Sequence, residues 1–113
     1  MSRSSNPLLT QHCQHASGAP LSADAIAEQL ALVPGWAQTS GTAAGIERSF
    51  SFADFYATMA FVNALAFIAH REDHHPDLQV SYNRCSVHFS THSVGGLSIN
   101  DFICAAHINA LLD

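Results

Sequence analysis

The most constraining feature of the sequence is a pair of short alternating segments, residues 78–82 and 85–91, separated only by Asn83 and Arg84. Alternation with a period of two is typical of strands that have one buried face. A connection this short joins antiparallel neighbours, so the two segments predict a β-hairpin. The second strand divides into two faces, with Cys85, Val87 and Phe89 on one and Ser86, His88, Ser90 and His92 on the other.

Helices are predicted on both sides of this hairpin. The longest covers residues 53–70, and Pro76 prevents its continuation because proline lacks the backbone N–H that a helix needs. Beyond the hairpin, Ser98 and Asp101 have the spacing of a capping box. They predict a last helix that ends near residue 111.

The first half of the chain adds a helix and two strands. Ser22 is a favourable N-cap and predicts a helix over residues 22–32. Residues 46–52 alternate and predict a strand, and the small, polar segment 38–45 predicts a weak strand broken by a turn at Gly41. The order of helix, strands, helix, hairpin and helix predicts an α+β fold in which helices cover one face of an antiparallel sheet.

The chain is short enough for one domain, which we place at residues 21–113. Residues 1–20 are polar with few apolar anchors and predict a flexible tail. His12, Cys13 and His15 lie in this tail; a metal-binding role is conceivable there, but a solvated tail is the preferred interpretation.

The helix predicted over residues 53–70 is apolar on two faces. One stripe consists of Phe55, Met59, Val62 and Ala66, and the other of Phe61, Leu65 and Ile68. A helix that is apolar nearly all round is buried on more than one side, so one face is expected to pack on the sheet. The second stripe is a candidate face for self-association or for binding another protein. Only 12% of the residues are charged, which also favours self-association.

Charge and cysteine content narrow the functional classes. The chain has four scattered arginines, no lysine and nine acidic residues, which gives a net charge of -5. Direct nucleic-acid binding is therefore not expected. The three cysteines show no CxxC spacing and predict neither a disulfide framework nor a cysteine zinc site. They are expected to be small buried hydrophobes in a reducing compartment.

Neither a membrane span nor a secretory signal is recognisable, and we expect a cytoplasmic protein.

Three histidines are the candidate catalytic residues: His74, His75 and His92. Imidazole both donates and accepts protons near neutral pH, so a pair of such groups can remove one proton and supply another. A metal site built from these residues with His88 and Asp101 is the alternative, but adjacent histidines in an extended segment point to opposite faces. Asp101 has a second explanation as a helix cap. His88 and His107 are given structural roles only.

The histidine spacing resembles a known family. His70, His74, His75 and Pro76, followed by His92 and Asp101, match the signature of the pterin-4a-carbinolamine dehydratases. The neighbouring segments agree, namely Gly35-Trp36, Phe50 to Phe55, Tyr82-Asn83-Arg84, Ser90-Thr91-His92 and Gly96-Leu97-Ser98. The resemblance covers residues 21–112.

The resemblance implies a four-stranded antiparallel sheet with helices on one face, and assembly into homodimers or homotetramers. It implies dehydration of 4a-hydroxytetrahydropterin to quinonoid dihydropterin, a hydro-lyase reaction that needs neither metal nor other cofactor. This reaction recycles the pterin of aromatic amino acid hydroxylases. A hydroxylase in the same pathway is therefore an implied partner.

The resemblance also implies roles for single residues. His74 and His92 correspond to the acid/base pair, and His75 to a residue that positions the substrate and assists proton transfer. Asp101 corresponds to an acidic residue that orients a histidine or a pterin nitrogen. His70, Ser90 and Thr91 complete the implied substrate-binding set, with histidine at position 70 where the family frequently has an acid.

Two other functions remain compatible with the sequence. Some relatives serve as dimerisation cofactors of transcription factors, and the stripe of Phe61, Leu65 and Ile68 could serve such a binding module. The pterin could also differ from tetrahydrobiopterin, for example a molybdopterin.

Overall fold

The computed structural model describes residues 6–40 and 44–112, and within them the chain forms three α-helices, four strands and two short 3₁₀ helices. The predicted turn at Gly41 and residues 1–5 of the predicted tail lie outside these residues. In chain order the elements are η2 (Pro7–Thr10), α1 (Ala23–Leu30), β1 (Ala37–Gln38), β2 (Ile46–Ser51), α2 (Phe55–Glu72), β3 (Asp77–Ser81), β4 (Arg84–Phe89), η3 (His92–Val94) and α3 (Ile99–Ala110).

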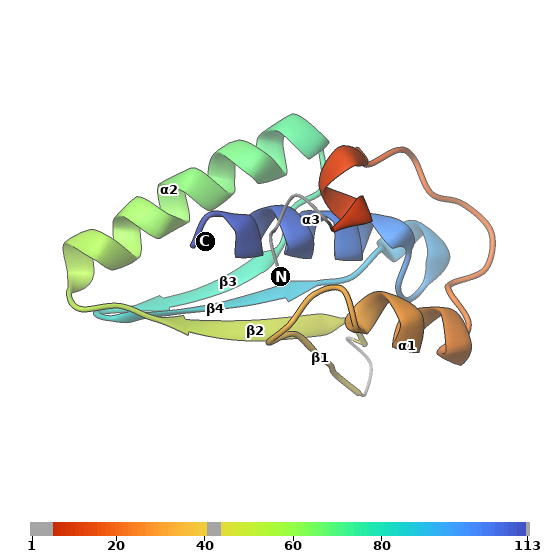
Figure 1. The fold of residues 1–113 in the computed structure, drawn as a ribbon, viewed down its shortest axis with the longest axis horizontal. Helices are drawn as coiled ribbons and strands as arrows, with labels where there is room; N and C mark the ends of the chain where they lie inside the picture. Colours follow the sequence, from red (N-terminus) through yellow and green to blue (C-terminus); the bar gives the residue numbers. More distant parts are fainter. Residues whose placement is uncertain (1–5, 41–43, 113) are drawn as a thin grey trace.

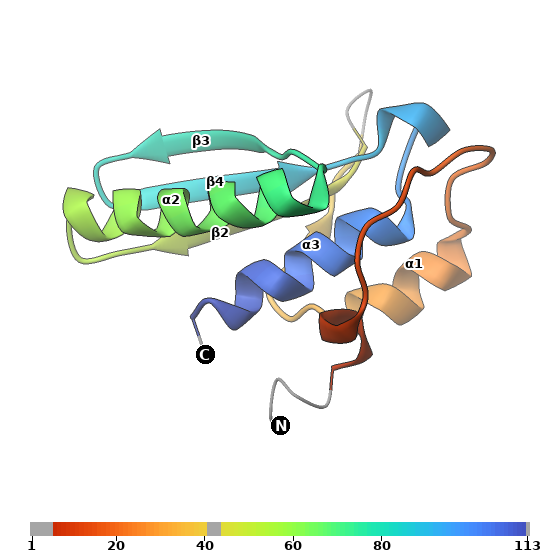
Figure 2. The ribbon, with the colours of Figure 1, turned by 90° about the horizontal axis from the view of Figure 1, so that it is seen from above.

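The four strands form one antiparallel sheet in the order β1-β2-β4-β3 (Figure 1). The predicted hairpin is confirmed as β3 and β4, with Asp77 opposite His88 and Ser81 opposite Arg84. Helices α2 and α3 lie on the same side of the sheet, and α1 lies alongside α3 (Figure 2). The predicted α+β fold class is confirmed.

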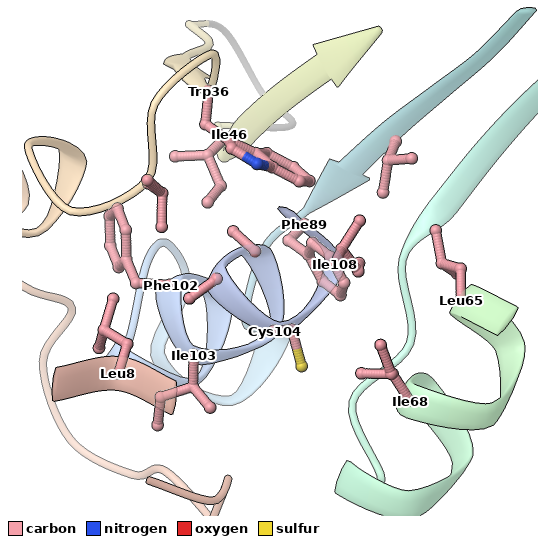
Figure 3. Packing of buried hydrophobic residues seen from close by; sticks show 14 of the residues in the cluster. Leu8, Trp36, Ile46, Leu65, Ile68, Phe89, Phe102, Ile103, Cys104 and Ile108 are labelled. Atoms are coloured by element: carbon pink, nitrogen blue, oxygen red, sulfur yellow. The ribbon is translucent and has the colours of Figure 1, made fainter. Parts of the chain in front are cut away.

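The core fills the space between the sheet and α3 (Figure 3). It receives the apolar face predicted for the second hairpin strand, since Cys85, Val87 and Phe89 are buried. The opposite face of the sheet is polar, and the Ser49 and Ser86 hydroxyls are 2.7 Å apart there. Among the residues that the structure describes, no helix is long and apolar enough to cross a membrane.

Helix α2 buries one of its two predicted apolar stripes. Phe61, Leu65 and Ile68 are between 1% and 5% exposed and belong to the core. The assignment of this stripe to a partner-binding face was therefore wrong. The outward side of α2 carries Phe55 and Phe67, which are 50% and 65% exposed.

Part of the N-terminal segment, predicted to be a flexible tail, packs against the domain. Leu8, in η2, is 1% exposed and joins the core (Figure 3), and the Asn6 side-chain amide donates to the Leu32 carbonyl oxygen at 2.7 Å. One well-placed leucine anchors the segment, although its average composition is polar. Packing against the domain thus begins before residue 20.

The end of β4 also differs from prediction. The strand stops at Phe89 rather than at residue 91, and Thr91 forms an isolated bridge with Gly96. The tight turn between them contains η3, which ends at Gly95 in the left-handed conformation with φ 67°. His92 therefore lies in a 3₁₀ turn and does not continue the polar face of the strand.

Candidate active site

The position of His74 is set by the end of α2. Asp73 terminates the helix in the left-handed conformation, with φ 51° and ψ 44°, and the His74 N–H donates to the Ala69 carbonyl oxygen at 3.1 Å. Pro76 then directs the chain into β3. This sharp reversal places the His74 side chain between the end of α2 and the beginning of α3, where it contacts Asp101.

His74 and Asp101 form the central contact of the site. The His74 Nε2 lies 2.6 Å from Asp101 Oδ1, with the carboxylate side chain fully buried and the imidazole 13% exposed. The imidazole ring also stacks on Phe89, with centroids 5.5 Å apart and planes at 9°. Because a carboxylate only accepts hydrogen bonds, Nε2 carries the proton and Nδ1 is the nitrogen able to accept one.

Asp101 connects His74 to two further elements. Its second oxygen, Oδ2, accepts hydrogen bonds from the Thr91 hydroxyl at 2.8 Å and from the Ser98 N–H at 3.0 Å. The Ser98 hydroxyl donates to Thr91 Oγ1 at 2.8 Å and caps α3, so the predicted capping box is confirmed. One buried carboxylate thus joins the end of α2, the end of β4 and the start of α3.

A cavity of about 290 Å³ opens beside this network. Its lining comprises residues 13–16 of the N-terminal segment, residues 72–74 at the end of α2, and Thr91, Ser93 and Asn100. His74 and Thr91 therefore face a space that can admit a small molecule, while Asp101 supports them from the protein side.

The N-terminal segment is attached to this cavity by polar contacts that sequence reasoning missed. The Cys13 N–H donates to Glu72 Oε1 at 2.7 Å, and Gln14 and Asn100 exchange two hydrogen bonds of 3.2 and 2.6 Å. The Ser93 hydroxyl donates to the Ala16 carbonyl oxygen at 2.6 Å. In each of these four bonds one partner is a backbone group, so the order of side chains along the sequence gave no indication of them.

Glu72 is the buried charge that anchors this segment. Its side chain is 1% exposed and also bonds His12 Nδ1 and Arg71 Nε, each at 2.9 Å. Burial by itself raises the pKa of Glu72, but the hydrogen bonds from Cys13, His12 and Arg71 outweigh it and lower the pKa from 4.5 to about 2.

Glu72→Gln is expected to lower the free energy of unfolding at pH 7 by about 1–3 kcal/mol. Because the folded-state pKa is depressed, the carboxylate stabilises the protein above pH 4.5, and its contribution is lost as the pH falls toward 2. Urea unfolding of both proteins at pH 7 and pH 3 should show a smaller difference at pH 3. The exposed Glu28→Gln serves as the control; an equal difference at both pH values for Glu72→Gln would contradict the assignment.

The remaining predicted site residues stay nearer the surface. His70, His75 and His92 are exposed, and Ser90 is half-buried. His75 follows His74 directly and His92 follows Thr91, so both neighbour residues that line the cavity. The structure therefore brings His74, Thr91 and Asp101 into contact, while roles for the other predicted residues remain predictions.

Two histidines that were given structural roles lie in other contacts. His88 Nε2 is 3.2 Å from the Thr39 hydroxyl on the polar face of the sheet, and His107 Nε2 is 3.2 Å from the Gln11 carbonyl oxygen. Within residues 6–40 and 44–112, no group of three or more His, Cys, Asp or Glu side chains is arranged to hold a metal ion.

Chemically, the site combines an oriented imidazole with a cavity. A neutral His74 held through Nε2 can take up a proton at Nδ1, and the Asp101 carboxylate stabilises the imidazolium that results. The arrangement is suited to moving a proton to or from a bound molecule.

Comparisons with known proteins identify the family of the chain. The family model for pterin 4 alpha carbinolamine dehydratase matches residues 19–111. A protein of Stenotrophomonas maltophilia that carries the dehydratase name is 56% identical over 109 residues, covering 95% of this chain and 93% of the relative. A similarly named protein of Nitrosospira multiformis is 51% identical over 106 residues, covering 92% and 91%.

Two solved structures also resemble the chain. A transcriptional coactivator/pterin dehydratase from Brucella melitensis has a TM-score of 0.78 and 34% identity, covering 83% of this chain and 99% of that one. A pterin dehydratase-like protein identified as a RuBisCO assembly factor in the alpha-carboxysome has a TM-score of 0.59 and 19% identity, covering 68% and 88%, and shows the fold alone. From the family match and the close relatives, the chain belongs to the pterin 4 alpha carbinolamine dehydratase family.

Proposed function

We propose that the chain catalyses the dehydration of 4a-hydroxytetrahydropterin to quinonoid dihydropterin by histidine acid/base catalysis. Membership of the family supports the reaction class. The observation that carries the proposal is the 2.6 Å contact between His74 and the buried Asp101 at the edge of a cavity. That contact fixes the tautomer and orientation of an imidazole that lines the cavity.

In the proposed mechanism, His74 and His92 form the acid/base pair. One imidazole removes the N5 proton while the other protonates the 4a-hydroxyl, so the C4a–O bond breaks, a C4a=N5 double bond forms and water leaves. His75 positions the substrate, with His70, Ser90 and Thr91 as further contacts. Asp101 is a positioning residue, because it acts through His74.

The experiment that tests the reaction compares dehydration rates with and without the protein in the presence of a chelator. A pterin-dependent hydroxylase generates the 4a-hydroxy intermediate, and absorbance follows its decay. A chelator-insensitive acceleration supports the proposal, and no acceleration over background overturns it. Running the assay with pterins of different side chains shows which 4a-hydroxytetrahydropterin the protein dehydrates fastest, and direct binding of a molybdopterin to the protein tests the alternative.

A recycling role follows from the proposed reaction. Its product is an oxidised dihydropterin, which a reductase must return to the tetrahydro form before a hydroxylase can use it again. The proposed partner is therefore an aromatic amino acid hydroxylase that shares the pterin pool, with no direct contact required between the two proteins.

We further propose that the outward face of α2 mediates self-association, the role previously given to the opposite stripe. Phe55, Tyr56 and Phe67 are 50%, 85% and 65% exposed on this helix. Large apolar side chains left exposed along one helix are typical of a protein interface. The same face is the candidate surface for a binding role of the kind named for the Brucella relative.

Changing Tyr56 and Phe67 together to glutamate is expected to convert the assembly to a smaller species without unfolding it, because both side chains are exposed. Leu65→Glu, on the buried side of the same helix, is expected to lower the free energy of unfolding by about 3–5 kcal/mol, since it places a charge in the core. Light scattering gives the mass and circular dichroism the fold. An unchanged mass for the double variant would exclude this face.

A further inference from the structure

Two cysteines meet at the edge of the cavity. Cys13 lies in the N-terminal segment and Cys104 in α3, and their sulfur atoms are 3.6 Å apart although 91 positions separate them in the chain. Cys13 Sγ also lies 3.6 Å from the Asn100 carbonyl oxygen, one turn earlier on α3. Both thiols are free in the structure. The contact therefore joins the segment that lines the cavity to the helix that begins beside it.

The two thiols differ in their surroundings. Cys13 is partly exposed and lines the cavity, so a small oxidant can reach it. Cys104 is fully buried in the core (Figure 3), and its hydrogen bond with Cys13 together with burial raises its pKa. Cys13 is therefore the thiol that reacts first, and Cys104 is placed to react with the product.

The segment around Cys13 is held by non-covalent contacts, which include packing of Cys13 against the core. Residues 11–16 contain neither helix nor strand, and their hydrogen bonds to Glu72, Asn100 and Ser93 fix them beside the cavity. In Figure 2 this red segment runs from η2 past α3. Because these residues form one wall of a cavity of about 290 Å³, their displacement changes access to it.

We propose that Cys13 and Cys104 form a reversible disulfide that fixes the N-terminal segment against α3 and restricts exchange of ligands at the His74 cavity. The disulfide would add a covalent bond at Cys13, in the middle of a segment that is otherwise held by non-covalent contacts. The effect on turnover rests on the dehydratase function proposed above, whereas the disulfide itself does not.

The chemistry requires one equivalent of a hydroperoxide. The Cys13 thiolate attacks one oxygen of hydrogen peroxide, the O–O bond breaks, and a sulfenic acid forms; the hydroxide that leaves takes up the proton lost by the Cys13 thiol and becomes water. The Cys104 sulfur then attacks the sulfenic sulfur, the S–O bond breaks, and the Cys104 proton leaves with the hydroxide as a second water. In total the two thiols lose two electrons and two protons, and hydrogen peroxide is reduced to two molecules of water.

The test treats the full-length protein with one equivalent of hydrogen peroxide. We expect a loss of about 2 Da, restored by dithiothreitol. Because trypsin leaves Cys85 and Cys104 on the same fragment, the map is made on the Cys85→Ala variant. There, fragments 4–48 and 85–113 should remain linked until reduction.

Amide exchange and turnover show whether the bond fixes the segment. Amides of residues 11–16 should exchange more slowly in the oxidised protein, and kcat/KM should fall by about 3- to 10-fold and recover on reduction. Cys13→Ala and Cys104→Ala should each lose both responses to peroxide, whereas Cys85→Ala should keep them.

Three results would overturn the proposal: disulfides between chains, oxidation of Cys13 without the link, or a linked protein whose exchange at residues 11–16 is unchanged. A linked protein with slowed exchange and unaltered turnover would overturn the restriction of the cavity. If the reduced protein has no dehydratase activity, the proposed function fails. The mass and the amide exchange still show whether the disulfide forms and whether it fixes the segment.

Discussion

Replacing His74 by glutamine is expected to lower kcat/KM for carbinolamine dehydration by about 10²–10⁴-fold while the protein stays folded. Glutamine can still donate a hydrogen bond toward Asp101, so the buried carboxylate keeps a partner. It cannot exchange a proton near neutral pH, which removes the proposed chemistry alone. The same loss is expected for His92→Gln, which is exposed and should not affect folding.

His88→Gln is the matched control for these variants. It replaces a half-buried histidine on the polar face of the sheet, away from the cavity, and should retain turnover. Stopped-flow measurement of the dehydration rate and circular dichroism of each variant separate lost chemistry from lost structure. Full turnover in both His74→Gln and His92→Gln would refute the acid/base pair.

Replacing Asp101 by asparagine is expected to lower the free energy of unfolding by about 1–3 kcal/mol and also to reduce kcat/KM. The two carboxylate oxygens accept from His74, Thr91 and Ser98. An amide has one accepting oxygen, so its NH₂ group must face a donor on one side. Either the cap of α3 or the orientation of His74 is then lost.

Ser98→Ala distinguishes these two consequences. This change removes the capping hydroxyl and should lower the free energy of unfolding by about 0.5–2 kcal/mol. The Asp101 carboxylate keeps its contact with His74. Nitrogen NMR of the His74 imidazole should show the proton on Nε2 in the wild type and in Ser98→Ala. In Asp101→Asn the distribution of the proton between Nε2 and Nδ1 should change. An unchanged His74 spectrum in Asp101→Asn would contradict the positioning role.

Features encoded by neighbouring residues could be predicted from the sequence. The capping box at Ser98 and Asp101 needs three residues of spacing, and the hairpin needs only alternation and a short turn. These local rules were enough to obtain the fold class and the approximate end of the longest helix, which was predicted at residue 70 and lies at Glu72.

Features that depend on distant packing could not be predicted. Both stripes of α2 are apolar, so periodicity alone could not decide that Leu65 faces inward and Phe55 outward. Leu8 enters the core from a polar segment, and the His74–Asp101 contact spans 27 positions. In each case the partner is set by tertiary structure, which no local pattern records.

The carboxylate of Asp101 belongs to two structures at once, the first turn of α3 and the support of His74. Each transient fraying of that turn therefore also releases the imidazole. The proposed reaction then depends on a local equilibrium between an open and a closed first turn of α3. The fraction of molecules that is active equals the fraction in which this turn is closed. Because the Ser98 amide is bonded to Asp101 only in the closed state, its exchange rate measures that fraction in a resting sample, without any substrate.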